Sequence, residues 1–214
     1  MKTAWLAGGG DFFAAGFKPQ QNDIVIAVDA GYSYREDIGI VPDTVVGDFD
    51  SLEFIPDHPE VETHPTIKDD TDMMLAVKKG IEKGCTRFII FGGTGGRIAH
   101  TLGNLQTLCG IAESGFEGYM IDKDYIFTAI SNSKLAFSSQ HSGYISLIPW
   151  GTPKAQVTIK GLKYEIDRTD LPHNRPLGIS NEFTGKEAAI TAHNGTVIAV
   201  FESQGILPGR EEIQ

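Results

Sequence analysis

Over its first 125 residues the chain alternates short apolar runs with stretches of helical periodicity. Runs such as IVIAV, TVV and RFIIF are rich in β-branched side chains and end at glycine or aspartate, which is typical of buried strands. Two stretches show helical spacing instead; the first carries Met73 or Met74, Val77 and Ile81, and Gly84 follows it. The second carries one apolar stripe made of Ile98, Leu102, Leu105, Leu108 and Ala112. Alternating strands and helices predict an α/β domain with a mostly parallel, Rossmann-like sheet and helices on both faces.

From about residue 126 the pattern changes to short strand-like runs separated by turn residues, with no helical stripe. YISLIPW and AQVTIKGL are examples. Asn194-Gly195 lies between two apolar runs, which predicts a two-residue β-hairpin. We therefore expect two domains, an α/β domain over residues 1–125 and a smaller antiparallel β domain over residues 126–214.

Composition excludes several classes of protein. The net charge is −10 and no cluster of Lys and Arg occurs, so we expect no nucleic-acid partner. No stretch approaches the roughly 18 apolar residues of a membrane span, and the N-terminus does not resemble a signal peptide. Cys85 and Cys109 form no metal-ligand pattern, which favours two reduced thiols in the core. We expect a soluble, cytoplasmic protein with no membrane partner.

Acidic residues stand where the predicted strands end. Asp29 ends one strand, Asp48 and Asp50 end the next, and Asp72 precedes the first helix. Asp48 and Asp50 are two residues apart, so in extended backbone both side chains point to the same side. Such carboxylates repel each other unless a cation lies between them, and Mg²⁺ prefers a few carboxylates together with substrate phosphates and water. Any one of these acids could instead form a turn, and Asp70 or Thr71 could simply cap the helix.

A glycine loop, FGGTGGR, joins the next strand to the second helix. Gly92, Gly93, Gly95 and Gly96 would let the backbone approach a ligand closely, and the helix N-terminus offers free N–H groups to phosphate oxygens. Arg97 adds a guanidinium group that suits phosphate. The loop could be a tight turn only, but beside the acidic strand ends it favours a nucleotide phosphate site. The stretch AGGGDF after the first strand could contribute to the same crevice.

Taken together, these motifs resemble those of the thiamine pyrophosphokinase family. The matching stretches are DAGYSY, PDTVVGDFDSL, DDTDMMLAVKKG, FGGTGGRIAHTLGNL and GISNEFTGKEA, which occur in the family's order and span nearly the whole chain. The resemblance implies transfer of the pyrophosphoryl group of ATP to the hydroxyl of thiamine, with release of AMP. It also implies an α/β nucleotide-binding catalytic domain followed by a thiamine-binding β-sandwich, and a homodimer with active sites at the subunit interface.

The resemblance also assigns roles to residues. Asp48, Asp50 and Asp72 would be the catalytic carboxylates and the Mg²⁺ ligands. The ATP-binding residues would be Asp29, Gly92, Gly93, Thr94, Gly95, Gly96, Arg97 and His100. Thiamine would contact Ser180, Asn181 and Phe183 in the second domain.

One position departs from the family pattern. The loop usually reads GGRxDH, but here Ala99 stands in place of the acid. Either that acid is dispensable or the loop is weakened.

Several choices stay open from the residues alone. Asp72 or Asp50 could accept the proton of the attacking hydroxyl. Trp150, Phe183 and Tyr164 could each contact the flat rings of thiamine, and each could equally be a core residue. The rival functions are another Mg²⁺-dependent nucleotide transferase, such as one moving a nucleotidyl group, and a sensor that binds both substrates without turnover.

Overall fold

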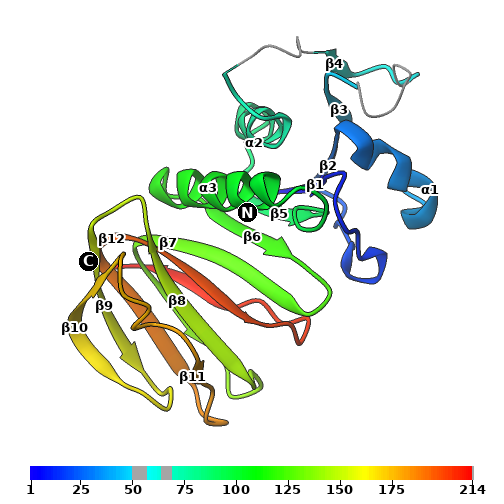
Figure 1. Ribbon diagram of the computed structural model, residues 1–214. Coiled ribbons are helices and arrows are strands. Elements are labelled where there is room, and N and C mark those ends of the chain that lie inside the picture. Colours follow the sequence, from blue (N-terminus) through cyan, green and yellow to red (C-terminus); the bar gives the residue numbers. More distant parts are fainter. Residues whose placement is uncertain (50–56, 64–68, 214) are drawn as a thin grey trace. The chain divides into compact units, whose positions relative to one another are not determined.

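The computed structural model describes residues 1–49, 57–63 and 69–213 (Figure 1). It is a mixed α/β fold with many strands and few helices. The chain divides into two compact units. The first contains residues 1–107 and 118–123, and the second contains residues 108–117 and 124–214.

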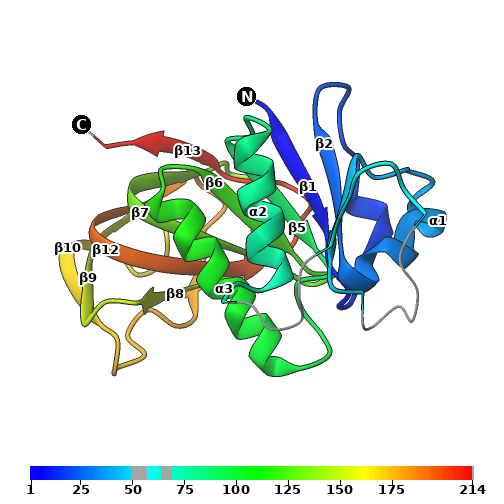
Figure 2. The same cartoon turned by 90° about the horizontal axis from the view of Figure 1, so that it is seen from above.

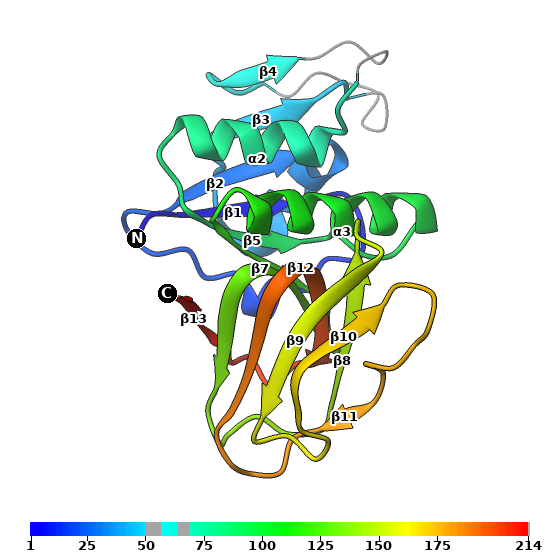
Figure 3. The ribbon, with the colours of Figure 1, turned by 90° about the vertical axis from the view of Figure 1, so that its left-hand side faces the viewer.

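The first unit is built on a sheet whose strand order reverses beside β1. Strands β2, β3 and β4 follow one another on one side of β1, and β5 and then β6 lie on the other side (Figure 3). The pairs β1–β2, β2–β3, β3–β4 and β1–β5 are parallel. In open parallel sheets, ligands bind beyond the carboxyl ends of the strands at such a reversal. The strands are β1 (Thr3–Ala7), β2 (Ile24–Val28), β3 (Thr44–Gly47), β4 (Val61–Thr63), β5 (Arg87–Phe91) and β6 (Glu117–Ile121).

The predicted helices both form. Helix α2 (Asp72–Glu82) begins after Thr71, whose hydroxyl accepts a hydrogen bond from the Met74 N–H (3.3 Å), so Thr71 is its cap. Helix α3 (Ile98–Glu113) is exposed over its first turn, at Ile98, and buried towards its end. The remaining helical elements are short: η1 (Ala14–Gly16), η2 (Asp29–Tyr34) and α1 (Arg35–Ile38). None of the helices that the structure describes is long and apolar enough to cross a membrane.

The two longer helices lie over the same face of the first sheet: Figure 3 shows α2 and α3 in front of its strands, and Figure 2 shows α2 in front of β5. The expectation of helices on both faces stays a prediction, since the other helical elements that the structure describes, η1, η2 and α1, are short. Ala4 faces α2 at Gly80, so Trp5, the next residue of β1, faces the opposite way. There Trp5 packs edge-on against Phe17 with ring centroids 5.3 Å apart, and Phe17 packs on Phe91 at the same distance. An aromatic cluster on the connection from β1 to β2 thus covers this face in place of a helix.

Asp23 links the β1–β2 connection to β1 through hydrogen bonds. Its carboxylate accepts hydrogen bonds from the Thr3 N–H (3.2 Å), the Trp5 Nε1–H (2.9 Å) and the Gln20 N–H (2.9 Å). Burial raises the pKa of Asp23, but the hydrogen bonds from Gln20, Trp5 and Thr3 outweigh burial, and the net pKa is lowered from its ordinary 3.8. A lowered pKa means that the carboxylate stabilises the fold above pH 3.8, and that this stabilisation is lost as the pH falls through the folded-state pKa.

We predict that Asp23→Ala lowers the free energy of unfolding at pH 7 by about 1–3 kcal/mol, because the partly buried N–H groups of Thr3 and Trp5 lose their acceptor. The loss should shrink as the pH falls from 3.8 through the lower folded-state pKa, since the wild-type carboxyl then becomes protonated in the folded chain. Urea unfolding followed by Trp5 fluorescence in a Trp150→Phe background would measure it. Asp57→Ala, at an exposed site, is the control. A loss that stays constant with pH would show that the charge of Asp23 does not matter.

The second unit is made of antiparallel strands. The central strand β12 pairs with β7 along its whole length, and β13 pairs with the other edge of β7. The other edge of β12 is shared between β9, which carries β10, and β8, which carries β11 (Figure 3). The strands are β7 (Tyr125–Phe137), β8 (Tyr144–Trp150), β9 (Lys154–Lys160), β10 (Ile166–Pro172), β11 (Asn181–Glu182), β12 (Ala188–Glu202) and β13 (Gly209–Glu212).

The hairpin predicted at Asn194-Gly195 is wrong. Both residues lie inside β12, where the pairing with β7 shifts register between Ala192 and Thr196. Gly195 has a φ of +81°, which an L side chain rarely adopts. The two apolar runs flank a bulge in one strand, and the bend lets the first run pair with β9 and the second with β8.

The two cysteines are buried, as expected for core thiols. Burial raises the pKa of Cys85, and burial together with Glu113 raises the pKa of Cys109 to about 12. Because the thiolate is the reactive form, neither residue is a nucleophile at neutral pH.

Candidate functional site

The loops that follow β1 and β5 are joined where the strand order of the first sheet reverses. The Gly8 N–H donates to the Phe91 carbonyl (2.8 Å), and the Gly10 N–H donates to the Gly92 carbonyl (2.9 Å). The Asp11 N–H donates to the Thr94 carbonyl (2.8 Å). The stretch AGGGDF therefore does contribute to the same place as the glycine loop.

Glycine is required on both sides of this junction. Gly92, Gly95 and Gly96 have φ values of +64°, +79° and +57°. A Cβ on Gly10 would lie 2.0 Å from the Thr94 carbonyl oxygen, so no other residue fits there. The glycine run is thus a structural requirement of the junction, and it also keeps bulk away from any ligand beside the loop.

Three side chains outside the glycine motif form hydrogen bonds with the loops after β1 and β5. The sequence analysis did not identify these side chains. The Asn104 amide, on α3, donates to the Gly93 carbonyl (2.7 Å). The Thr94 hydroxyl donates to the carboxylate of Asp122, the residue after β6. The Tyr34 hydroxyl donates to the Gly10 carbonyl (2.8 Å). Asp122 could have been found, since it is an acid at a strand end like the others, whereas Asn104 and Tyr34 carry no sequence signal of this kind.

The predicted acids that the structure describes gather at the same edge of the sheet. Asp29 follows β2 and Asp48 follows β3, and both are half-buried. A Cβ on Gly47 would lie 3.0 Å from the Asp29 Cα, so the two neighbouring strand ends are in contact. Asp29 itself has a φ of +50°, a strained value for a residue other than glycine. Asp50 lies outside the described residues.

Asp72 is brought to this edge by the direction of α2. Met73 packs against Gly8 at the carboxyl end of β1, while Gly80 packs against Ala4 and Phe88 near the other ends of β1 and β5. The helix therefore runs antiparallel to the strands, and its first residue, Asp72, lies at their carboxyl ends. Asp72 is half-buried.

The charge of this edge decides how it can hold a nucleotide. ATP is an anion with several charges, and aspartates that face it would repel it unless a cation intervened. Mg²⁺ typically takes one or two carboxylates and completes its shell with phosphate oxygens and water, so Asp48 and Asp72 are suitable ligands. The described residues contain no cluster of three or more potential metal-binding side chains. The charged residues in the described loops and helix starts at this edge include Asp11, Asp29, Asp48, Asp72 and Asp122, and also Arg97 and Lys123.

The residues after the glycine loop form the exposed start of α3. Arg97, Ala99 and His100 are all exposed, and the His100 N–H donates to the Arg97 carbonyl (2.9 Å). Ala99 lies in the first turn of the helix, so the family's missing acid would project from an exposed position. Its replacement by alanine removes nothing from the core.

In the second unit, the predicted thiamine residues are adjacent but differ in environment. Ser180 is exposed and has a φ of +61°. Asn181 is buried; its side-chain oxygen accepts from the Tyr164 and Glu182 N–H groups (3.0 and 2.9 Å), and its nitrogen donates to the Tyr164 carbonyl (2.8 Å). Phe183 packs against Phe137, with ring centroids 5.2 Å apart. Asn181 and Phe183 thus help to build this region, and Ser180 is the exposed member of the three.

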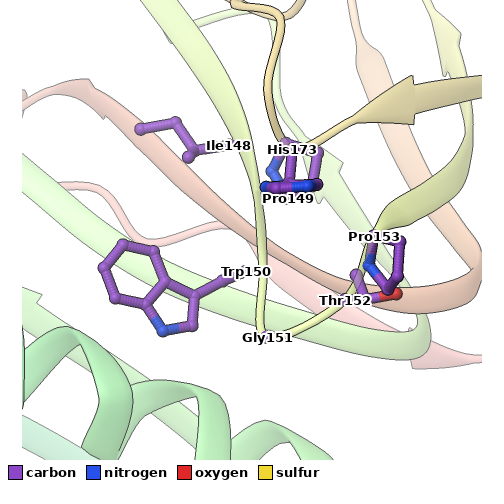
Figure 4. Close-up of a pocket in the computed structure, with 7 residues that line it drawn as sticks. All are labelled: Ile148, Pro149, Trp150, Gly151, Thr152, Pro153 and His173. Carbon is purple, nitrogen blue, oxygen red and sulfur yellow. The ribbon is translucent and has the colours of Figure 1, made fainter.

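The aromatic candidates occupy two separate places. Trp150 lines a pocket of about 520 Å³ at the turn after β8, where Ile148 and Trp150 lie on one side of the strand and Pro149 and His173 on the other (Figure 4). Asn181 pairs with Ile145 near the other end of β8, so roughly 16 Å of strand separates it from Trp150. Tyr164, in contrast, is exposed and is bonded to Asn181 through its backbone. Within one subunit, Tyr164 rather than Trp150 lies beside the predicted thiamine residues.

Comparison with known proteins decides the family. One family model, thiamin pyrophosphokinase catalytic domain, matches residues 19–120, and a second, thiamin pyrophosphokinase vitamin B1 binding domain, matches residues 133–197. The chain belongs to the thiamine pyrophosphokinase family. The thiamine pyrophosphokinase of Bacillus subtilis is 29% identical over 187 residues, which are 84% of this chain and 87% of that protein.

Solved thiamine pyrophosphokinase structures are similar over nearly the whole chain. The crystal structure from Bacillus subtilis has a TM-score of 0.81 and 27% identity, covering 95% of this chain and 100% of that one. The structure from Geobacillus thermodenitrificans has a TM-score of 0.79 and 25% identity, covering 95% and 98%. The catalytic-domain match includes the acidic edge and the glycine loop, and the vitamin B1 binding match includes Ser180 to Phe183.

Proposed function

We propose that the chain is an enzyme that transfers the pyrophosphoryl group of ATP to the hydroxyl of thiamine, giving thiamine pyrophosphate and AMP. The observation that carries the proposal is that the glycine loop and the ends of β2 and β3, which bear Asp29 and Asp48, lie at the carboxyl edge of one parallel sheet, in a chain matched by both domains of one family. We interpret the first unit as a Rossmann-like nucleotide-binding domain and the second as a β-sandwich that binds thiamine. We further propose a cytoplasmic homodimer with active sites at the subunit interface.

Different residues of the chain would bind the phosphates, bind the metal ion and accept the proton. The glycine loop with Arg97 would hold the phosphates, because its N–H groups and the guanidinium are donors for their oxygens. Mg²⁺ bound by Asp48 and Asp72, with Asp50, would neutralise charge on the β- and γ-phosphate oxygens. A carboxylate at this edge, Asp72 or Asp50, would accept the proton of the thiamine hydroxyl. Most of the rate enhancement would then come from positioning and electrostatics.

Incubation with ATP, Mg²⁺ and thiamine, followed by mass identification of the products, tests the proposal. Thiamine pyrophosphate together with AMP is the expected result. Release of pyrophosphate with an adenylylated acceptor would instead identify a nucleotidyl transferase. Binding of both substrates with no product would identify a sensor.

Two single substitutions should separate the two substrates. Arg97→Ala should raise the KM for ATP about tenfold, because one charge-assisted contact is lost, and leave the KM for thiamine within twofold. Ser180→Gly should do the reverse, raising the KM for thiamine about tenfold through loss of one hydroxyl. Glycine adopts the φ of +61° without strain, so the Tm should not fall.

Steady-state kinetics with each substrate varied in turn gives the KM values of both variants, and thermal unfolding gives their Tm. Ser180 and Arg97 are both exposed, so neither substitution disturbs the core. If both variants raised both KM values equally, the assignment of ATP to the first unit and thiamine to the second would be wrong.

A further inference from the structure

We infer that Asn104 and Asp122 are positioning residues that hold the glycine loop in the conformation that binds the phosphates of ATP. The inference rests on the proposed function. Neither residue belongs to the glycine run; Asn104 lies within α3, and Asp122 follows β6. Both are half-buried, and both reach the loop between its positive-φ glycines.

The carbonyls of the glycine loop are held towards the protein. Four consecutive carbonyls, those of residues 91 to 94, each accept a hydrogen bond. The first, second and fourth accept from the backbone N–H groups of Gly8, Gly10 and Asp11. The third, that of Gly93, accepts from the Asn104 side chain at 2.7 Å. Carbonyl oxygens held in this way are kept away from the phosphates, which they would repel, and N–H groups of such a loop are the groups that attract an anion.

A loop of this composition is flexible unless other residues restrain it. Three of the five residues from Gly92 to Gly96 have positive φ, and glycine loses more conformational freedom on ordering than any other residue. A ligand that needs an ordered loop binds more weakly when the loop is flexible. Its affinity falls in proportion to the fraction of molecules in which the loop is already ordered. Side chains that hold the loop before ATP arrives therefore raise the affinity without touching ATP.

The two side-chain contacts restrain neighbouring loop residues from different elements. Asn104 holds Gly93 from the helix that follows the loop, and Asp122 holds the Thr94 hydroxyl from the next strand end. The backbone of Asp11 holds Thr94 from a third direction. With these contacts the loop's central residues are fixed on three sides, and loss of one of them should loosen the loop without unfolding the unit.

The test replaces each side chain by one of similar size without its hydrogen bond. Asn104→Leu and Asp122→Leu should each raise the Kd for Mg-ATP, measured by calorimetry, and the KM for ATP by about tenfold, the scale of one hydrogen bond. The KM for thiamine should change by less than twofold. Asp122→Asn keeps an acceptor for the Thr94 hydroxyl, so it should restore most of the affinity.

Thr107→Val is the matched control on the same helix. It removes a buried side-chain hydrogen bond to the Gly103 carbonyl (3.1 Å), which does not involve the loop, so it should lower the Tm but leave the Kd for ATP unchanged. Unchanged ATP affinity in both leucine variants would overturn the inference while leaving the proposed function in place. An equal rise in Kd with Thr107→Val would also overturn it, since the effect would then come from stability. Failure of the wild-type chain to bind Mg-ATP would overturn both the inference and the proposed function.

Discussion

Replacement of Asp48 by asparagine should leave the chain folded and lower kcat at least about a thousandfold. Asparagine has the same shape, so the half-buried position after β3 can accept it. It removes the negative charge that the proposed function requires to hold Mg²⁺ beside the phosphates. Removal of one electrostatic group that acts in the transition state typically costs 10²–10³-fold, and loss of the metal would add to this.

The rate of product formation at saturating Mg²⁺ and substrates, together with the Tm, would check this prediction. Asp57→Asn, which removes one exposed carboxylate elsewhere in the described residues, is the matched control and should retain full activity. A folded Asp48→Asn chain with more than about a tenth of the wild-type rate would show that Asp48 is not a metal ligand. High Mg²⁺ concentrations should rescue the variant partly if the site is weakened rather than lost.

The sequence predicted those parts of the site that depend on local pattern and sheet direction. Strands that run parallel end at one edge, so the strand pattern alone was enough to place Asp29 and Asp48 together. The glycine loop could be placed at the same edge because it follows β5, which runs parallel to these strands. The fold class followed from the same alternation of strands and helices.

The features that the sequence did not predict depend on contacts between distant residues. The face behind β1 is covered by Phe17 and its aromatic neighbours, and a cluster of this kind has no periodic pattern in the sequence. Asn194-Gly195 is typical of a hairpin, but whether such a pair reverses the chain or bends one strand depends on which strands lie alongside. Asn181 stays a predicted thiamine residue; that its amide holds the backbone of Tyr164 could not be seen in the sequence.

Asp29, Asp48 and Asp72, which we call the acidic edge, belong to the first unit of the chain, and Ser180 belongs to the second. A complete site therefore needs residues from both units. Around Ser180 the second unit exposes apolar or aromatic side chains, with Tyr164 at 59%, Leu177 at 52% and Ile179 at 47% exposure. The Gly178 carbonyl accepts from the Leu147 N–H (2.8 Å), so this segment is attached to β8. Ordered apolar side chains on a surface favour contact with another molecule, and the proposed homodimer would supply a second copy of this chain.

If each site combines the acidic edge of one subunit with Ser180 of its partner, two inactive variants should complement each other. Asp48→Asn disables the first part, and Ser180→Trp should block the second by placing a bulky side chain at an exposed position; because Ser180 has a φ of +61°, the Tm of this variant is measured to show that it folds. Each homodimer should have less than a few per cent of the wild-type rate. In the heterodimer one site carries both changes and the other carries neither, so its rate should reach about half that of wild type. Differently tagged chains, co-expressed and purified through both tags, give the heterodimer for this measurement. A heterodimer no more active than its parents, or a fully active monomer in ultracentrifugation, would show that each subunit holds a complete site of its own.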